Sequence, residues 1–72
     1  MKTERLIKMA NDISDFFNAE TDKEVAAEGV KNHIIRSWEP RMRREIISYL
    51  ERDGSQLCDL AKTAISRISL PQ

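Results

Sequence analysis

The sequence predicts an all-α fold, a small compact bundle of three to four short antiparallel helices. Apolar residues recur at spacings of three and four along the chain, and no useful length alternates apolar with polar residues. Pro40, Gly54 and Pro71 divide the chain into short segments, and short connections favour antiparallel neighbours. Since 72 residues provide one domain at most, we expect a single helical domain over residues 1–72.

The first expected helix covers about residues 4–18. Thr3 is placed to cap its start. Phe16 and Phe17 are expected to lie mainly in the core. The apolar face of this helix consists of residues at i, i+4, i+7 and i+11, namely Leu6, Ala10, Ile13 and Phe17.

The second expected helix covers about residues 22–37. Thr21 and Glu24 form a capping-box pattern at its start. Gly29 lies in the helix interior, where glycine costs about 1 kcal/mol relative to alanine. We interpret this glycine as a point where another helix approaches closely. The apolar face consists of Ala26, Val30 and Ile34.

The third and fourth helices are expected at about residues 40–52 and 56–69. Pro40 suits the first position of a helix, and Gly54 suits the left-handed conformation that ends one. Ser55 is expected to cap the fourth helix, and Pro71 prevents its continuation. The apolar faces consist of Met42, Ile46 and Leu50 in the third helix and of Leu57, Ala61, Ala64 and Ile68 in the fourth.

Composition narrows the class of protein. Twelve basic and twelve acidic residues cancel, whereas a nucleic-acid-binding domain is usually clearly basic. The single cysteine, Cys58, allows no internal disulfide and no cysteine-based zinc site, which fits a reducing cytosol. No apolar run approaches a membrane span, and the first residues lack the apolar stretch of a signal peptide. We therefore expect a cytoplasmic protein that does not enter a membrane.

The sequence offers little material for a catalytic site. A nucleophile, a base and an orienting group are needed, yet His33 and Cys58 are single residues on different expected helices. His33 has no second histidine or cysteine at a spacing that binds metal, so we expect it at the edge of the core with a hydrogen bond to a neighbour. The expectation is no catalytic, cofactor-binding or metal-binding residue in this chain.

Residues 33–44 form the most informative segment for function. Four arginines (Arg36, Arg41, Arg43 and Arg44) stand there against one acidic residue, Glu39, and the only tryptophan, Trp38, lies beside Pro40. Arginine and tryptophan are enriched at the energetic centres of protein interfaces. The alternative is a solvated helix face whose arginines pair with Glu45 and Glu51, with Trp38 covering the core. The residues alone leave both interpretations open.

Two segments and their spacing resemble a known family. The first holds Met9-Ala10-Asn11, Ile13 and Phe16-Phe17, and the second holds Gly29-Val30, His33 and Trp38-Glu39-Pro40-Arg41-Met42-Arg43. The pattern is similar to the delta subunit of the soluble, NAD-dependent, molybdenum-containing formate dehydrogenase. The resemblance covers roughly residues 4–50. It departs at Ser14, where a small residue such as glycine is expected, and no family motif follows Asp53.

The resemblance implies a non-catalytic accessory subunit that binds the large alpha subunit and supports assembly or stability of the complex. Such a chain carries no cofactor; the molybdenum cofactor, iron–sulfur clusters and flavin are expected in the partner subunits. The implied partner-binding residues are Arg36, Trp38, Pro40, Arg41, Met42, Arg43 and Arg44, with Asn11, Phe16 and His33 as second choices.

Other partners remain possible on the same residues. The isolated chain could form a homodimer. Two alternative functions use the arginines of residues 36–44 differently: a small helical nucleic-acid-binding protein, and a chaperone that handles the molybdenum cofactor. Neutral net charge argues against nucleic acid as the partner.

Overall fold

The computed structural model describes residues 2–68. It contains four helices, α1 (Thr3–Phe17), α2 (Lys23–Ser37), α3 (Pro40–Arg52) and α4 (Asp59–Ile68), and no strand within the described range. The predicted all-α class is confirmed. The Pro71 stop lies outside the described residues. No helix among residues 2–68 is long and apolar enough to cross a membrane.

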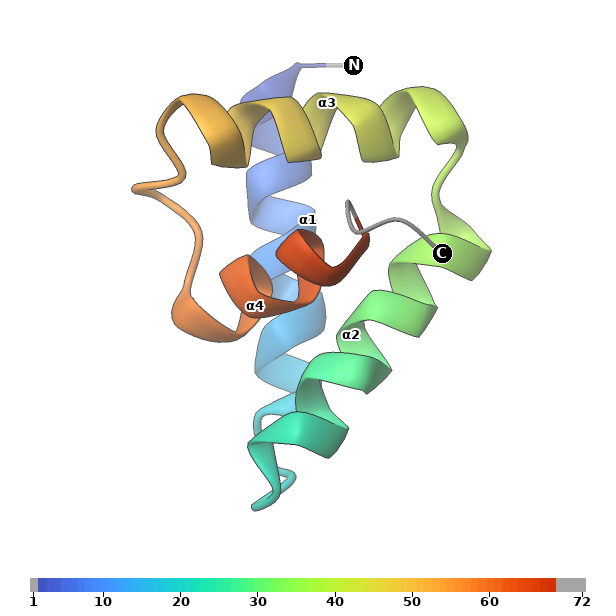
Figure 1. Cartoon of the computed structure of the whole chain (residues 1–72), viewed down its shortest axis with the longest axis vertical. Helices are drawn as coiled ribbons and strands as arrows, with labels where there is room; N and C mark the ends of the chain where they lie inside the picture. The colour runs from blue at the N-terminus through green and yellow to red at the C-terminus, as the bar shows by residue number, and fades with distance from the viewer. Residues whose placement is uncertain (1, 69–72) are drawn as a thin grey trace.

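The helices pack as a hairpin covered on one side and at one end (Figure 1). α1 and α2 run in opposite directions and are joined by the short turn of residues 18–22. α4 lies in front of α1 in this view and makes its most extensive contacts with α2. α3 crosses the N-terminal half of α1. This arrangement leaves the side of the α1–α2 hairpin opposite α4 without a covering helix among residues 2–68.

The core is built where the apolar faces meet. Small residues are fully buried in both α2 and α4, namely Ala26, Ala27, Ala61 and Ala64. Larger side chains fill the remaining space beneath α3. The largest fully buried side chains are Leu6, Val30, Ile34, Ile46 and Ile65, with Ser14 as the buried polar residue.

The helix starts differ from the predicted caps by one residue. Lys2 occupies the N-cap position of α1 without a side-chain cap, and the Thr3 hydroxyl instead donates to Glu45 of α3. At α2 the cap is Asp22, whose carboxylate accepts from the backbone N–H of Glu24 and Val25. The capping-box prediction for Thr21 was therefore wrong. Asp is as good an N-cap as Thr, so pattern alone does not decide between adjacent candidates.

The start of α4 also corrects the prediction. The helix begins at Asp59 rather than near residue 56, and the Ser55 hydroxyl donates to the Asp53 carboxylate (2.9 Å) instead of capping α4. Asn11 of α1 ties down the loop: its Nδ2 donates to the Gln56 carbonyl (3.0 Å) and its Oδ1 accepts from the Cys58 N–H (2.9 Å). The Asn11 side chain therefore binds the turn before α4.

Both glycines have the structural role that the sequence predicted. Gly54 has φ +70°, the left-handed conformation that ends α3. At Gly29, a Cβ atom would lie 2.5 Å from Cε1 of Phe17, so the absence of a side chain lets the α1 ring pack against α2. The expected close approach at Gly29 is confirmed.

The prediction that Phe16 lies in the core was wrong, since its side chain is 78% exposed. The buried face of α1 is centred on Leu6, Ala10 and Ser14, which turns Phe16 outward and leaves Phe17 half-buried. Ser14 fits between helices because its hydroxyl donates to the Ala10 carbonyl (2.9 Å) and has no unsatisfied polar group. A small residue at this position is thus a packing requirement.

Candidate functional site

The junction between α2 and α3 is built around Trp38. Its backbone N–H donates to the Ile34 carbonyl (2.9 Å) and ends α2, while Glu39 takes an extended conformation that allows Pro40 to begin α3. The Trp38 side chain is only 4% exposed and belongs to the core. Trp38 therefore supports the junction from inside, and its contact with a partner stays a prediction. Met42 is likewise partly buried against the core.

Arg43 holds the junction in place from outside the core. Its Nη1 donates to the Trp38 carbonyl (2.6 Å) and to the Ile35 carbonyl (3.2 Å) at the end of α2. A cation that binds the last carbonyls of a helix satisfies acceptors that lack helical partners and favours the negative end of the helix dipole. Arg43 therefore has a structural role in this chain, although it belongs to the arginine-rich segment.

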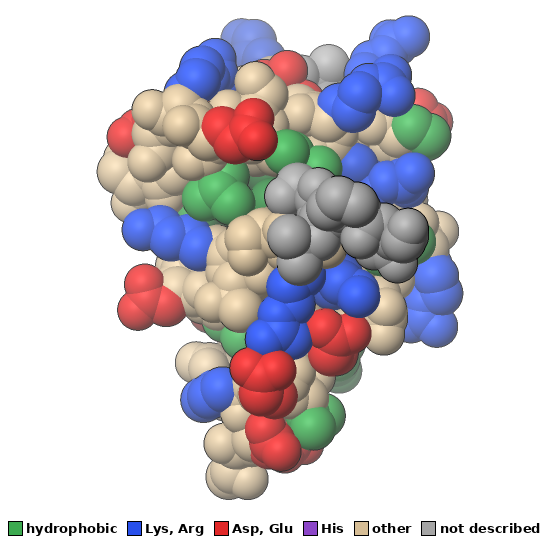
Figure 2. All heavy atoms as spheres, in the orientation of Figure 1, with side chains coloured by type: hydrophobic (Ala, Val, Ile, Leu, Met, Phe, Trp, Pro, Cys, Tyr) green, Lys and Arg blue, Asp and Glu red, His purple; other side chains and the backbone are tan. Residues whose placement is uncertain are grey.

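The other predicted residues of the segment face solvent. Arg36, Pro40, Arg41 and Arg44 are exposed. None of these three arginines has an ion pair within the described range, and Glu45 lies near Arg52 instead, at 4.0 Å. We call Arg36, Arg41 and Arg44 the arginine surface. Basic side chains project above the junction where α3 begins, as Figure 2 shows at its upper right.

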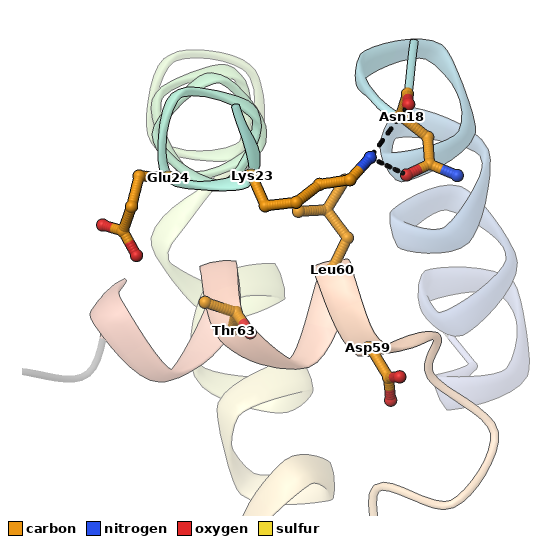
Figure 3. A pocket seen from close by; sticks show the side chains of 6 residues that line it. All are labelled: Asn18, Lys23, Glu24, Asp59, Leu60 and Thr63. Carbon is orange, nitrogen blue, oxygen red and sulfur yellow. Dashed lines mark hydrogen bonds between the residues drawn. The ribbon is translucent and has the colours of Figure 1, made fainter. Parts of the chain in front are cut away.

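The opposite end of the molecule, at the α1–α2 turn, is acidic. Residues 12–28 contain six acidic side chains and one basic one, Lys23, and acidic side chains gather at the lower end of Figure 2. Lys23 reaches back to α1, where its Nζ donates to the carbonyl (3.1 Å) and side-chain oxygen (2.9 Å) of Asn18 (Figure 3). A hollow of about 320 Å³ lies beneath this contact, against Leu60 and Thr63 of α4. Lys23, the one basic residue of residues 12–28, is thus engaged in closing the turn.

The chain was compared with known proteins. The family model for the NADH-dependent formate dehydrogenase delta subunit, FdsD, matches residues 5–65. The chain belongs to this family. A search of the curated proteins and a search of the solved structures each found no match. The match extends past Asp53, where the sequence motifs had ended, and includes most of α4.

FdsD family membership makes this chain a delta subunit of a formate dehydrogenase complex, which implies partner subunits. Residues 36–44 have two structural roles. Trp38, Met42 and Arg43 build the junction, whereas Pro40, Arg41 and the flanking Arg36 and Arg44 lie on its outside. Sequence reasoning placed all seven on one surface because proximity along the chain does not reveal which side chains turn inward.

His33 and Phe17 form a second feature that links α1 and α2. Their ring centroids lie 6.5 Å apart in an edge-on arrangement, and Phe16 packs edge-on against Phe17 at 5.2 Å. His33 lies at the edge of the core, as predicted, but its neighbour is the Phe17 ring, and the expected hydrogen bond is not found within residues 2–68. These rings, with Asp12 and Ile13, line a hollow of about 340 Å³. The sequence analysis did not predict this hollow. The available signal was Gly29, which lies against Phe17 of the aromatic pair Phe16 and Phe17.

Ion pairs connect α2 to α4 on the covered side. Arg67 contacts Glu24 (2.7 Å) and Glu28 (2.8 Å), and Lys31 also contacts Glu28 (3.2 Å). Hydrogen bonds from Arg67 and then Lys31 lower the pKa of Glu28 below its usual range. The hydrogen bonds that Arg67 donates to Glu24 and then to Glu28 raise the pKa of Arg67. No group of three or more His, Cys, Asp or Glu residues within residues 2–68 is arranged to hold a metal ion.

Proposed function

We propose that this chain is a non-catalytic accessory subunit that binds the large molybdenum-containing alpha subunit of NADH-dependent formate dehydrogenase and supports assembly or stability of that complex. In this proposal the molybdenum cofactor, iron–sulfur clusters and flavin belong to the partner subunits. Family membership supports the complex, and the arginine surface supports the mode of binding.

The proposed binding mode is inferred from the arginine surface, which lies on a fixed junction between α2 and α3. Arg36, Arg41 and Arg44 are exposed and have no ion pair among residues 2–68. The backbone beneath them is held by buried Trp38 and by the two Arg43 hydrogen bonds. The fixed backbone and the planar guanidinium fork limit the freedom that each arginine loses when it binds a carboxylate. We therefore propose an acidic surface of the alpha subunit as the partner.

Capture of the alpha subunit by tagged chain tests the proposal. The tagged chain is produced with the other formate dehydrogenase subunits, purified at low salt, and the co-eluting subunits are identified by mass spectrometry. We expect the large alpha subunit in stoichiometric amount. The triple variant Arg36→Ala, Arg41→Ala, Arg44→Ala should weaken binding by about 2 kcal/mol, a factor of about 30, while its helical circular dichroism stays unchanged.

Arg52→Ala is the matched control for charge, because Arg52 is exposed at the other end of α3. It should leave capture unchanged. Recovery of the chain without any other subunit would contradict the proposal. Binding of a nucleic acid by the chain, weakening steeply with salt, or binding of the isolated molybdenum cofactor would instead support one of the two alternative functions.

A further inference from the structure

The side of the α1–α2 hairpin that faces away from α4 is exposed and follows a regular pattern in both helices. In α1, residues at i, i+4, i+7 and i+11 share this side; they are Arg5, Met9, Asp12 and Phe16. In α2 the corresponding residues are Val25, Gly29, Asn32 and Arg36. We call these eight residues, with the hollow between the helices, the open face. Met9 and Gly29 are partly buried, and the other six residues are exposed.

Large apolar side chains concentrate at one end of the open face. Phe16 is 78% exposed and Val25 is 55% exposed, and these are the two most exposed large hydrophobic residues of the described chain. They lie at the end of α1 and the start of α2, on either side of the turn. The hollow of about 340 Å³ lies beside Phe16, lined by Ile13, Phe17 and His33. This end of the open face therefore has an exposed aromatic ring, Phe16, beside an apolar hollow.

The two ends of the open face carry opposite charge. Because α1 and α2 run in opposite directions, Arg5 and Arg36 lie at the same end, toward α3 (Figure 1). The other end borders the turn region, where Asp15, Glu20 and Asp22 are exposed. None of these five residues has an ion pair within the part of the chain that the structure describes. The open face is therefore apolar and acidic at one end and basic at the other.

A second copy of the chain does not match both the charges and the hollow in a symmetric dimer. A two-fold axis along the helices would place the arginine end of one copy on the arginine end of the other. A two-fold axis across the helices would pair the acidic turn of one copy with Arg5 and Arg36 of the other, but it would place Phe16 at that arginine end, away from the hollow. The first arrangement opposes like charges, and the second leaves the hollow without an apolar side chain from the other copy.

We propose that the open face binds an amphipathic helix of a partner subunit in the formate dehydrogenase complex. The helix lies along the open face, with an apolar side chain in the hollow beside Phe16. Its acidic residues lie beside Arg5 and Arg36, and its basic residues lie beside the acidic residues of the turn region, since opposite charges favour this direction over the reverse. The proposal rests on the proposed function in requiring a partner subunit, and it adds a contact separate from Arg41 and Arg44.

Site-specific photocrosslinking in the assembled complex tests both the occupant and its direction. A photoreactive phenylalanine analogue replaces Phe16 in one preparation and Arg36 in another, and the crosslinked peptides are sequenced. We expect both positions to capture one helix of another subunit. The two crosslinked sites should lie about 11 residues apart, because Val25 and Arg36 span that length of helix beside it. Basic residues should surround the Phe16 site, and acidic residues the Arg36 site.

Phe16→Asp provides the energetic test, with Thr63→Asp as its matched control. Both changes add one negative charge at an exposed helical position, and Thr63 lies on α4, away from the open face. Phe16→Asp should weaken capture of the partner subunit by about 30-fold, as for an aromatic hot spot, with helicity retained. Thr63→Asp should leave capture unchanged.

Three results would overturn the inference. One is crosslinking of position 16 to a second copy of the chain, which would make the open face a homodimer contact. Another is equal capture by Phe16→Asp and Thr63→Asp; if the triple arginine variant still loses capture, the proposed function stands and only the open-face helix is refuted. Failure of the unaltered chain to capture any subunit would refute both proposals together.

Discussion

The two sides of the α1–α2 hairpin differ in how they treat apolar residues. In α2 and in α4, which covers one side, Ala26, Ala27, Ala61 and Ala64 are all fully buried. On the open face, Phe16 and Val25 project into solvent. Small side chains allow helices to approach closely and interdigitate at the density of a protein interior. The chain thus buries these alanines together with larger core residues such as Ile34 and Ile65, and leaves Phe16 and Val25 uncovered.

This difference indicates which residues serve folding and which serve binding. A chain of 72 residues has little apolar material to spare, and a Phe16 ring that is 78% exposed contributes little to folding. Substitutions on the covered side should therefore lower the free energy of unfolding. Substitutions on the open face should affect association while leaving unfolding nearly unchanged.

The largest expected effect on stability is at Trp38. Trp38→Ala should lower the free energy of unfolding by about 3–5 kcal/mol, because it removes a large buried ring and leaves a cavity under the α2–α3 junction. Urea unfolding followed by circular dichroism measures this loss. Phe16→Ala is the matched aromatic substitution on the open face and should change the same quantity by less than about 0.5 kcal/mol. Equal losses for the two variants would remove the distinction between the sides.

Overpacking the covered side should have the next largest effect. Ala61→Leu inserts a branched side chain where α4 meets the rest of the core, and Ala61 has no exposed surface. We expect a loss of about 1–3 kcal/mol, since neighbouring side chains must leave their preferred rotamers. Val25→Leu adds apolar volume on the open face and should be close to neutral in the same urea titration. A neutral Ala61→Leu would show that the α2–α4 contact is loose.

Asn11 should have a smaller effect, through the loop that precedes α4. Asn11→Ala removes the two hydrogen bonds to the Gln56 carbonyl and the Cys58 N–H, and we expect a loss of about 1–2 kcal/mol. Hydrogen exchange should show the greatest loss of amide protection at residues 56–58. Asn32→Ala, at an exposed position of α2, is the control and should leave exchange unchanged. Exchange that rises uniformly along the chain would argue against a local role for Asn11.

The smallest expected effect concerns acid stability. Arg67 and Lys31 lower the pKa of Glu28, so the folded state binds the Glu28 proton less readily than the unfolded state. The stabilisation is present above the usual carboxyl pKa and is lost as the pH falls through the lowered value. Below about pH 4, the urea midpoint should fall more steeply for the unaltered chain than for Glu28→Gln. Parallel profiles would mean that this exposed ion pair adds nothing to stability.

The helices were predictable because their signals are local. Apolar spacing, Pro40 and Gly54 gave α1, α2 and α3 within one residue at each end. The start of α4 was missed because Ser55 can cap a helix yet binds Asp53 in the loop, and Asn11, far away in sequence, fixes that loop instead. Hydrogen bonds from a side chain far away in the sequence, such as Asn11, cannot be recognised from the residues of the loop itself.

The segment that holds the candidate site could be recognised in the sequence, but the structural role of each of its residues could not. The arginine-rich segment does occupy one junction, but Trp38 turns inward and Arg43 binds the end of α2. Whether a residue turns inward depends on where α1 and α4 lie, as does the outward turn of Phe16. The Arg67 pair with Glu24 and Glu28 joins residues about 40 positions apart, so no pattern within one helix could have shown it.

Arginine footprinting of the assembled complex tests most directly the claim that this delta subunit docks through its arginine surface. The chain is treated with phenylglyoxal, which modifies accessible arginines, free and in the purified complex, and each site is quantified by mass spectrometry. The account predicts strong modification of Arg36, Arg41 and Arg44 in the free chain and protection of all three in the complex, with Arg52 equally modified in both. Unchanged modification of Arg36, Arg41 and Arg44 in the complex would contradict it.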